Sequence, residues 1–271
     1  MQNWPLIGQG TWMIEQDREE RAIEALRTGI ELGMTLIDTA EMYGSGEAEQ
    51  VVGKAIRGLR DRVFLVSKVL PSNASYDGTR RACEKSLRRL GVDSLDLYLL
   101  HWPGSHPIAE TMRGLESLVN DGMTRLIGVS NFDVDELQPA LRALKNQPLA
   151  CNQVLYHLGD RGIERRLIPF CRRQEIAVMG YSPFGHSGLP KPSSAGGRVL
   201  TRIAAESGKT VRQVVLSFLT RDGCWAIPKS GNPEHVRENA GALDFQLSTS
   251  AIEAINRAFP APDHDVPLGM I

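Results

Sequence analysis

Residues 35–44 read TLIDTAEMYG: a short apolar run ends in Asp38 and leads into a loop that carries Tyr43. A carboxylate at the end of a buried strand costs free energy unless another group pairs with it. In an open, doubly wound sheet that binds a dinucleotide, a G-x-G-x-x-G turn follows the first strand, and this stretch has none. It therefore favours a closed barrel, and it leaves a carboxylate and a phenol to be explained.

Other apolar runs of strand length follow along the chain. Together with the first run, the strand candidates are residues 35–38, 63–68, 95–100, 125–130, 150–154, 176–181, 224–229 and 243–245. Most of them are nearly continuous apolar runs, as expected for parallel strands that are buried on both faces.

Amphipathic runs with helical spacing separate the strand candidates. Two of them begin with a predicted capping box, at Asp17 to Glu20 and at Asp133 to Glu136, and a pair of helices is expected in residues 197–221. Strand and helix alternate about eight times with no long linker and no change in composition. The pattern predicts an α/β fold, a single (β/α)8 TIM barrel domain over residues 1–271, with an open doubly wound sheet as the alternative.

The composition is that of an ordinary globular protein, with 42% hydrophobic residues, 23% charged residues and a formal net charge of −1. This charge argues against nucleic acid or an anionic membrane as a partner. The N-terminus does not have the pattern of a signal peptide, and no stretch approaches a membrane span. The four cysteines form no C-x-x-C pair, and no metal-ligand spacing is visible. We therefore expect a cytoplasmic protein with reduced, buried thiols and no metal.

Polar residues stand at the ends of seven consecutive strand candidates. They are Asp38 with Tyr43 in the loop after it, Lys68, His101 with Trp102, Ser130 with Asn131, Asn152 with Gln153, Tyr181 with Ser182, and Lys229 with Ser230. Each has an ordinary alternative reading when taken alone, such as a salt-bridged core lysine or a packed tyrosine. The active sites of barrels lie at the carboxyl ends of the strands, so all seven ends would face one mouth. The pattern predicts one site there.

Four of these residues suit proton transfer to an oxygen atom. An ammonium beside a phenol lowers the pKa of the phenol, and a carboxylate beside that ammonium compensates its buried charge. We expect Tyr43 to act as a general acid near neutral pH because Lys68 lowers its pKa, and His101 to orient a carbonyl oxygen. No side chain supplies the hydride that turns a carbonyl into an alcohol, so a nicotinamide cofactor is needed.

The other residues at the mouth suit that cofactor. Amide and hydroxyl side chains match the two edges of a carboxamide, a tyrosine offers a ring for stacking, and a lysine with a serine suits a phosphate. In the same order, these are Ser130, Asn131 and Gln153, then Tyr181, then Lys229 and Ser230.

Blocks that span most of the chain resemble the aldo-keto reductase superfamily and appear in its order. They are GQGTW (8–12), LGMTLIDTAEMYG (32–44), VSKV (66–69), LDLYLLHWP (95–103), IGVSNF (127–132), NQVLYH (152–157), YSPFG (181–185) and IPKSGNPEHVREN (227–239). The nearest likeness is to short bacterial members that act on small carbonyl compounds. The resemblance implies an enzyme that uses NADP(H) to reduce small aldehydes and ketones.

The resemblance also implies roles for single residues. The catalytic tetrad would be Asp38, Tyr43, Lys68 and His101, with Tyr43 as the proton donor in reduction. The cofactor contacts would be Gly10, Thr11, Trp12, Asp38, Ser130, Asn131, Gln153, Tyr181, Ser182, Phe184, Gly185, His186, Lys229, Ser230, His235, Glu238 and Asn239. Trp12, Met42 and Trp102 match positions that line the substrate pocket, although plain packing is an equal alternative for Met42.

Three departures from the family pattern bear on function. His235 stands where the family often has arginine, and because histidine is only partly protonated at pH 7, the preference for NADP(H) over NAD(H) should be weaker. Only residues 104–107 separate Pro103 from the next helix, which predicts an open pocket with broad substrate selection. Residues 186–198 are rich in Gly, Ser and Pro, which indicates either a loop that orders on the cofactor or a plain surface loop.

Three alternatives compete with this reading. One is a reductase that prefers NAD(H). The second is a cofactor-sensing partner protein with little turnover, which we would expect to have additional exposed apolar surface. The third is a metal-dependent hydrolase, which needs a cluster of His and carboxylate ligands, and only Asp38 and His101 qualify. For the reductase we expect a small-molecule carbonyl substrate and a monomer.

Overall fold

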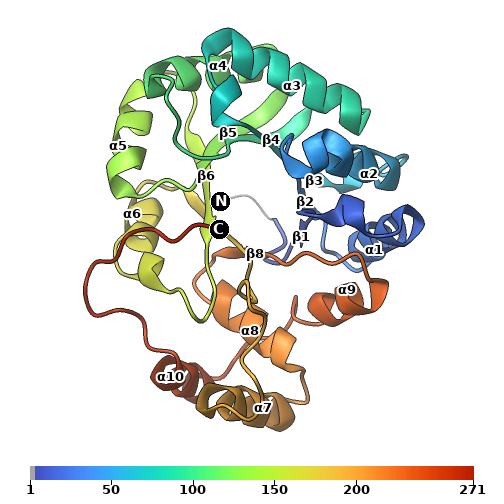
Figure 1. The fold of residues 1–271 in the computed structure, drawn as a ribbon. Helices are drawn as coiled ribbons and strands as arrows, with labels where there is room; N and C mark the ends of the chain where they lie inside the picture. The colour runs from blue at the N-terminus through green and yellow to red at the C-terminus, as the bar shows by residue number, and fades with distance from the viewer. Residues whose placement is uncertain (1–3) are drawn as a thin grey trace.

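The computed structural model describes residues 4–271, and its eight strands form one parallel sheet that curves into a barrel (Figure 1). Each strand pairs with the next one in the chain. The strands are β1 (Gln9–Gly10), β2 (Leu36–Asp38), β3 (Phe64–Val69), β4 (Leu95–Leu100), β5 (Thr124–Ser130), β6 (Leu149–Leu155), β7 (Ala177–Tyr181) and β8 (Trp225–Ile227). The predicted α/β barrel is confirmed.

Backbone hydrogen bonds at the seam between β8 and β1 bring the two ends of the sheet together. The N–H of Gly8 donates to the carbonyl oxygen of Ala226 at 2.9 Å, and the N–H of Gly10 donates to that of Pro228 at 3.1 Å. A Cβ atom on Gly10 would lie 2.7 Å from the carbonyl oxygen of Ile227. Glycine at position 10 therefore allows the two backbones to approach this closely.

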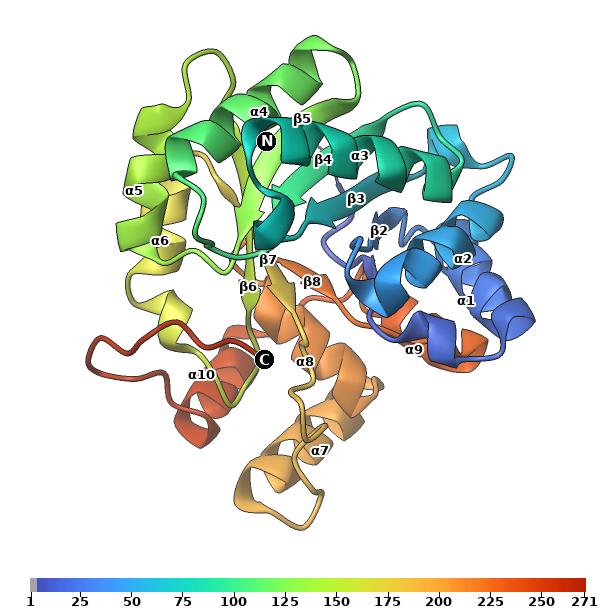
Figure 2. The same ribbon diagram turned by 45° about the horizontal axis from the view of Figure 1, so that its top comes forward.

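The α-helices in the described part of the chain form a ring outside the strands (Figures 1 and 2). They are α1 (Glu19–Glu31), α2 (Glu47–Ala55), α3 (Tyr76–Leu90), α4 (Ile108–Asn120), α5 (Val134–Ala143), α6 (Leu167–Arg173), α7 (Ala195–Ser207), α8 (Val211–Thr220), α9 (Pro233–Ala240) and α10 (Thr249–Ala258). After α10 the chain passes α6 and ends over the centre of the barrel (Figures 1 and 2). No helix within residues 4–271 is both long and apolar enough to cross a membrane.

Two apolar layers hold the barrel together, one on each face of the sheet. Alternate residues of a strand point to opposite faces, so Leu36 and Leu97 lie in the cluster inside the barrel, while Ile37 and Tyr98 belong to the cluster beneath the helices. All four side chains are fully buried. This burial on both faces explains the continuous apolar runs in the sequence, and it fixes the positions of the strand ends.

Two predictions about individual strands were wrong. The first strand is β1, which was not predicted because two residues that include a glycine make no apolar run. Residues 243–245, predicted to be a strand, lie in and just after the turn that follows α9, where Leu243 and Phe245 pack against buried clusters. The predicted number of strands, eight, agrees with the structure of residues 4–271 only because one real strand was not predicted and one predicted strand is absent.

The two predicted capping boxes had opposite outcomes. The box at Asp133 and Glu136 is confirmed at the start of α5. Asp17 does not cap α1, because the N-cap residue is Arg18 and no side chain caps it. The Asp17 carboxylate instead lies 2.6 Å from the ammonium of Lys229, in the loop after β8.

Candidate active site

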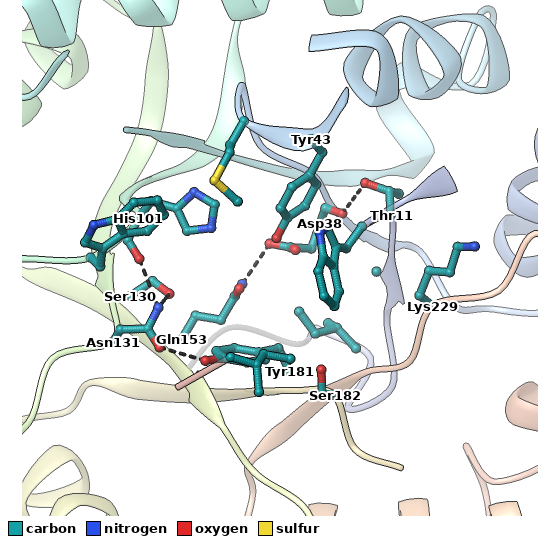
Figure 3. Close-up of a pocket in the computed structure, with 16 residues that line it drawn as sticks. Thr11, Asp38, Tyr43, His101, Ser130, Asn131, Gln153, Tyr181, Ser182 and Lys229 are labelled. Carbon is teal, nitrogen blue, oxygen red and sulfur yellow. Dashed lines mark hydrogen bonds between the residues drawn. The ribbon is translucent and has the colours of Figure 1, made fainter. Parts of the chain in front are cut away.

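A pocket that opens to solvent lies at the carboxyl ends of the strands. Its lining residues are Gly10, Thr11, Trp12, Asp38, Met42, Tyr43, His101, Trp102, Ser130, Asn131, Gln153, Tyr181, Ser182, Ile227, Lys229 and Ile271. In Figure 3, Tyr43, His101, Gln153 and Tyr181 surround a common space. The barrel thus brings together at one mouth side chains from seven of its eight strands or the loops that follow them.

Lys68 is fully buried behind this pocket, and its ammonium links three groups. It donates to Asp38 Oδ2 at 2.7 Å, to the carbonyl oxygen of Thr39 at 2.9 Å and to the phenol oxygen of Tyr43 at 3.2 Å. The second carboxylate oxygen of Asp38 accepts from Gln153 Nε2 at 2.7 Å. The buried charges of Asp38 and Lys68 are therefore paired and hydrogen-bonded, as buried charges must be.

Burial by itself lowers the pKa of Lys68, but the charge of Asp38 and the hydrogen bonds outweigh it and raise the pKa. For Tyr43, burial raises the pKa more than Lys68 lowers it, and Asp38 raises it further. The predicted direction of the Lys68 effect is therefore confirmed, but the expected net lowering of the pKa is wrong, because burial outweighs that effect. Because the pKa is raised, the phenol carries its proton at neutral pH.

His101 packs against two aromatic side chains, Tyr43 and Trp102. Its ring centroid is 5.7 Å from that of Tyr43 in an edge-on arrangement and 4.7 Å from that of Trp102. Burial, together with the charge of Lys68, lowers the pKa of His101 to about 2. The imidazole is therefore neutral at physiological pH, and it offers a hydrogen bond rather than a charge.

A hydrogen-bonded wall lies opposite Tyr43 (Figure 3). Asn131 Nδ2 donates to the carbonyl oxygen of His101 at 3.1 Å and to Ser130 Oγ at 3.3 Å, and the Tyr181 hydroxyl donates to Asn131 Oδ1 at 2.9 Å. These bonds fix the ring of Tyr181 at the side of the pocket. Asn152, predicted at the same strand end as Gln153, points to the other face of β6, where its Nδ2 donates to the carbonyl oxygen of Phe132.

The opposite rim is apolar. Trp12 and Met42 are each 38% exposed, and Trp102 is half-buried. Ile271, from the segment after α10, lines the same pocket. The side chains of Trp12, Met42 and Trp102 carry no charge, so this rim suits a neutral ligand.

The other predicted cofactor residues lie outside the pocket lining. They are Phe184, Gly185, His186, Ser230, His235, Glu238 and Asn239. The guanidinium of Arg212 joins two of them, because it stacks over the ring of Phe184 at 4.7 Å and its Nε lies 3.3 Å from Glu238. His186 and His235 are exposed. The loop after β7 is shorter than predicted, since Ser194 caps α7 and residues 195–198 are helical.

Three features of the chain fit a nicotinamide dinucleotide, two of them at this mouth and one in α9. The ring of Tyr181 is held at the pocket wall, and the ammonium of Lys229 stands at its rim. Asn239 is buried, and its Oδ1 has no hydrogen-bond partner among residues 4–271. A buried acceptor of this kind is costly unless a ligand satisfies it. Among residues 4–271, no cluster of three or more His, Cys, Asp or Glu residues is arranged to hold a metal ion.

Four residues in or beside the site were not predicted from the sequence, namely Asp17, Arg212, Ile227 and Ile271. The block IPKSG contains Ile227, so its place beside Lys229 was available as a signal. The other three reach the site through contacts with residues far away in the chain, and no local pattern marks them.

Comparison with known proteins identifies one family. Residues 6–259 match the model of the Aldo/keto reductase family. The chain is 46% identical over 270 residues to the methylglyoxal reductase YeaE of Escherichia coli (strain K12), covering 98% of this chain and 95% of that protein. It is 37% identical over 265 residues to the glyoxal reductase of Bacillus subtilis (strain 168), covering 96% and 92%.

Two crystal structures of aldo-keto reductases from Klebsiella pneumoniae superpose closely on the barrel. One is a complex with NADP and acetate, with a TM-score of 0.93 and 45% identity, covering 99% of this chain and 96% of that one. The other is a complex with NADPH, with the same TM-score and identity, covering 99% and 95%.

Proposed function

Because this chain belongs to the aldo/keto reductase family, we propose that it reduces small aldehydes and ketones to alcohols, with NADP(H) as the cofactor and Tyr43 as the proton donor. The observation that carries the proposal is the buried ammonium of Lys68, which binds both Asp38 and the phenol oxygen of Tyr43 behind the pocket. This arrangement stabilises a phenolate, the form in which Tyr43 is left once it has given up its proton.

The nicotinamide, when bound, supplies the hydride that adds to the carbonyl carbon. The chain's own residues supply the proton. Tyr43 donates the proton of its hydroxyl to the carbonyl oxygen, and Lys68 stabilises the phenolate that remains. Asp38 holds Lys68 charged and in place. The neutral imidazole of His101, edge-on to Tyr43, donates a hydrogen bond that orients the same oxygen.

We assign the wall opposite Tyr43 to the nicotinamide. Gln153 uses its amide N–H group on Asp38, so its amide oxygen is left to accept from the carboxamide. The ring of Tyr181, fixed by Asn131, offers a face for stacking. The buried, unpartnered Oδ1 of Asn239 suits the amino group of an adenine. The complexes of the Klebsiella pneumoniae enzymes with NADP and NADPH support this choice of cofactor.

We further propose that the substrates are small dicarbonyl compounds of the methylglyoxal and glyoxal type. The names of the Escherichia coli and Bacillus subtilis relatives support this class, and so does the neutral, apolar rim formed by Trp12, Met42 and Trp102. The test is an assay of a panel of carbonyl compounds, with NADPH and NADH side by side. The reaction is measured as the loss of cofactor absorbance. Turnover of methylglyoxal or glyoxal is expected, and no turnover of any carbonyl compound would contradict the proposed function.

An NAD(H)-preferring reductase is the second candidate, and two observations favour it. Position 235 is histidine rather than arginine, so it has neither a permanent charge nor a forked donor for a 2′-phosphate, and Lys229 is already paired with a carboxylate. The same panel decides between them through the ratio of kcat/KM for NADPH and NADH.

We also propose that the enzyme works as a cytoplasmic monomer. Its four cysteines are buried free thiols, and burial raises their pKa, which suits a reducing compartment. Size-exclusion chromatography with light scattering tests the oligomeric state, and a dimer mass would contradict it.

A further inference from the structure

Asp17 and Lys229 form an ion pair across the seam of the barrel. Asp17 lies in the loop after β1 and Lys229 in the loop after β8, and Asp17 Oδ2 is 2.6 Å from Lys229 Nζ. Both side chains are about one-third exposed, at 36% and 32%. Because the partners are 212 residues apart, the pair depends on the closed barrel rather than on local structure.

The carboxylate of Asp17 also packs directly against the backbone at Gly231. A Cβ atom at position 231 would lie 2.2 Å from Asp17 Oδ2, so only a glycine leaves room for this side chain. Gly231 directly precedes Asn232, the N-cap of α9, where backbone N–H groups and the helix dipole favour a negative charge. Asp17 therefore supplies the anion at a place where Lys229 and the start of α9 both attract one.

Lys229 lines the mouth pocket beside Gly10. Under the proposed function, on which this inference rests, its ammonium meets a phosphate of the cofactor. A phosphate at that position would stand close to the carboxylate of Asp17, and like charges repel. In that case the carboxylate has to move away, or the phosphate binds less tightly than Lys229 alone would allow.

We propose that Asp17 competes with a phosphate group of the cofactor for Lys229, and thereby lowers the affinity of the protein for nicotinamide dinucleotides that carry this phosphate. The pair is partly exposed, and ion pairs of this kind are weak. A cofactor can therefore displace Asp17, and the competition tunes the affinity rather than blocking binding.

The experiment is calorimetric titration of the full chain with NADPH and with NADH, without substrate. Asp17→Asn keeps the shape of the side chain and removes its charge. We expect this variant to bind NADPH about fivefold more tightly than the unaltered protein. A gain limited to NADPH assigns Lys229 to the 2′-phosphate, and an equal gain for NADH assigns it to the pyrophosphate; both results support the competition.

Glu19→Gln is the matched control. Glu19 is an exposed carboxylate two residues further along the chain, paired at 2.7 Å with Lys54 away from the pocket. Glu19→Gln removes the same charge as Asp17→Asn, so a general electrostatic effect would make both variants bind NADPH more tightly. Competition for Lys229 predicts tighter binding for Asp17→Asn alone.

Two results would overturn the inference. Weaker binding in Asp17→Asn would mean that the ion pair holds the cofactor in place, and unchanged binding would mean that Asp17 has no part in it. Asp17→Ser, a smaller neutral variant, provides the same comparison if the first variant folds poorly. If the unaltered protein bound neither dinucleotide, the proposed function itself would fail, and that result is distinct from both.

Discussion

The ammonium of Lys68 donates a hydrogen bond to the phenol oxygen of Tyr43 over 3.2 Å. An ammonium has no acceptor, so the direction of this bond is fixed, and the hydrogen of the phenol remains available to another oxygen. Burial raises the pKa of Tyr43, so the phenol keeps that hydrogen at neutral pH. Under the proposed function, one lysine would therefore both orient the proton donor Tyr43 and stabilise the phenolate that remains after the proton is given up.

Replacing Lys68 tests the pairing of buried charges. Lys68→Met leaves the carboxylate of Asp38 buried without its cation, and we expect a loss of about 3–5 kcal/mol in the free energy of unfolding. Urea denaturation measures it. The double variant with Asp38→Asn removes both charges and should regain much of the lost stability without regaining activity. A single variant as stable as the unaltered protein would contradict the pairing.

The lowered pKa of His101 predicts how stability depends on pH. In the folded protein the imidazole stays neutral down to about pH 2, whereas in the unfolded chain it takes up a proton below about pH 6.5. The unfolded state therefore binds more protons as the pH falls, and this residue alone should lower the free energy of unfolding by about 2 kcal/mol between pH 7 and pH 5.

His101→Gln removes this titration. Urea denaturation at the two pH values should show a smaller loss of stability in the variant than in the unaltered protein. An equal loss in both proteins would mean that His101 takes up its proton in the folded state as readily as in the unfolded one.

His235 gives a prediction about cofactor choice. The side chain is exposed at the start of α9, and arginine at this position would provide a permanent charge and a forked donor for a phosphate. We expect His235→Arg to raise the ratio of NADPH affinity to NADH affinity by about tenfold. Fluorescence titration with each cofactor measures the ratio, and an unchanged ratio would place position 235 away from the phosphate.

The strand ends were predictable because a parallel strand that is buried on both faces forms a nearly continuous apolar run. Asp38, Lys68 and Gln153 lie toward the carboxyl ends of such runs, and all strands of a parallel barrel present these ends to the same mouth. The same rule fails for β1, whose two residues carry no pattern, and for residues 243–245, where apolar side chains serve helix packing.

Other properties of the site depend on the assembled fold. The pKa of Tyr43 is set by how deeply the phenol is buried, which no spacing in the sequence reveals. Asp17 looks like a helix cap in the sequence, and a partner 212 residues away draws it elsewhere. Ile271 reaches the pocket because the segment after α10 passes α6 and ends over the barrel (Figure 1).

The most direct test of the proposed chemistry is Tyr43→Phe, measured as kcat/KM for methylglyoxal and as the Kd for NADPH in the same preparation. The substitution removes one hydroxyl and keeps the ring that packs against His101. The account predicts that kcat/KM falls by at least about a hundredfold, because the proton donor is lost, while the Kd stays within about twofold. A variant that binds NADPH normally and still reduces methylglyoxal at the full rate would contradict it.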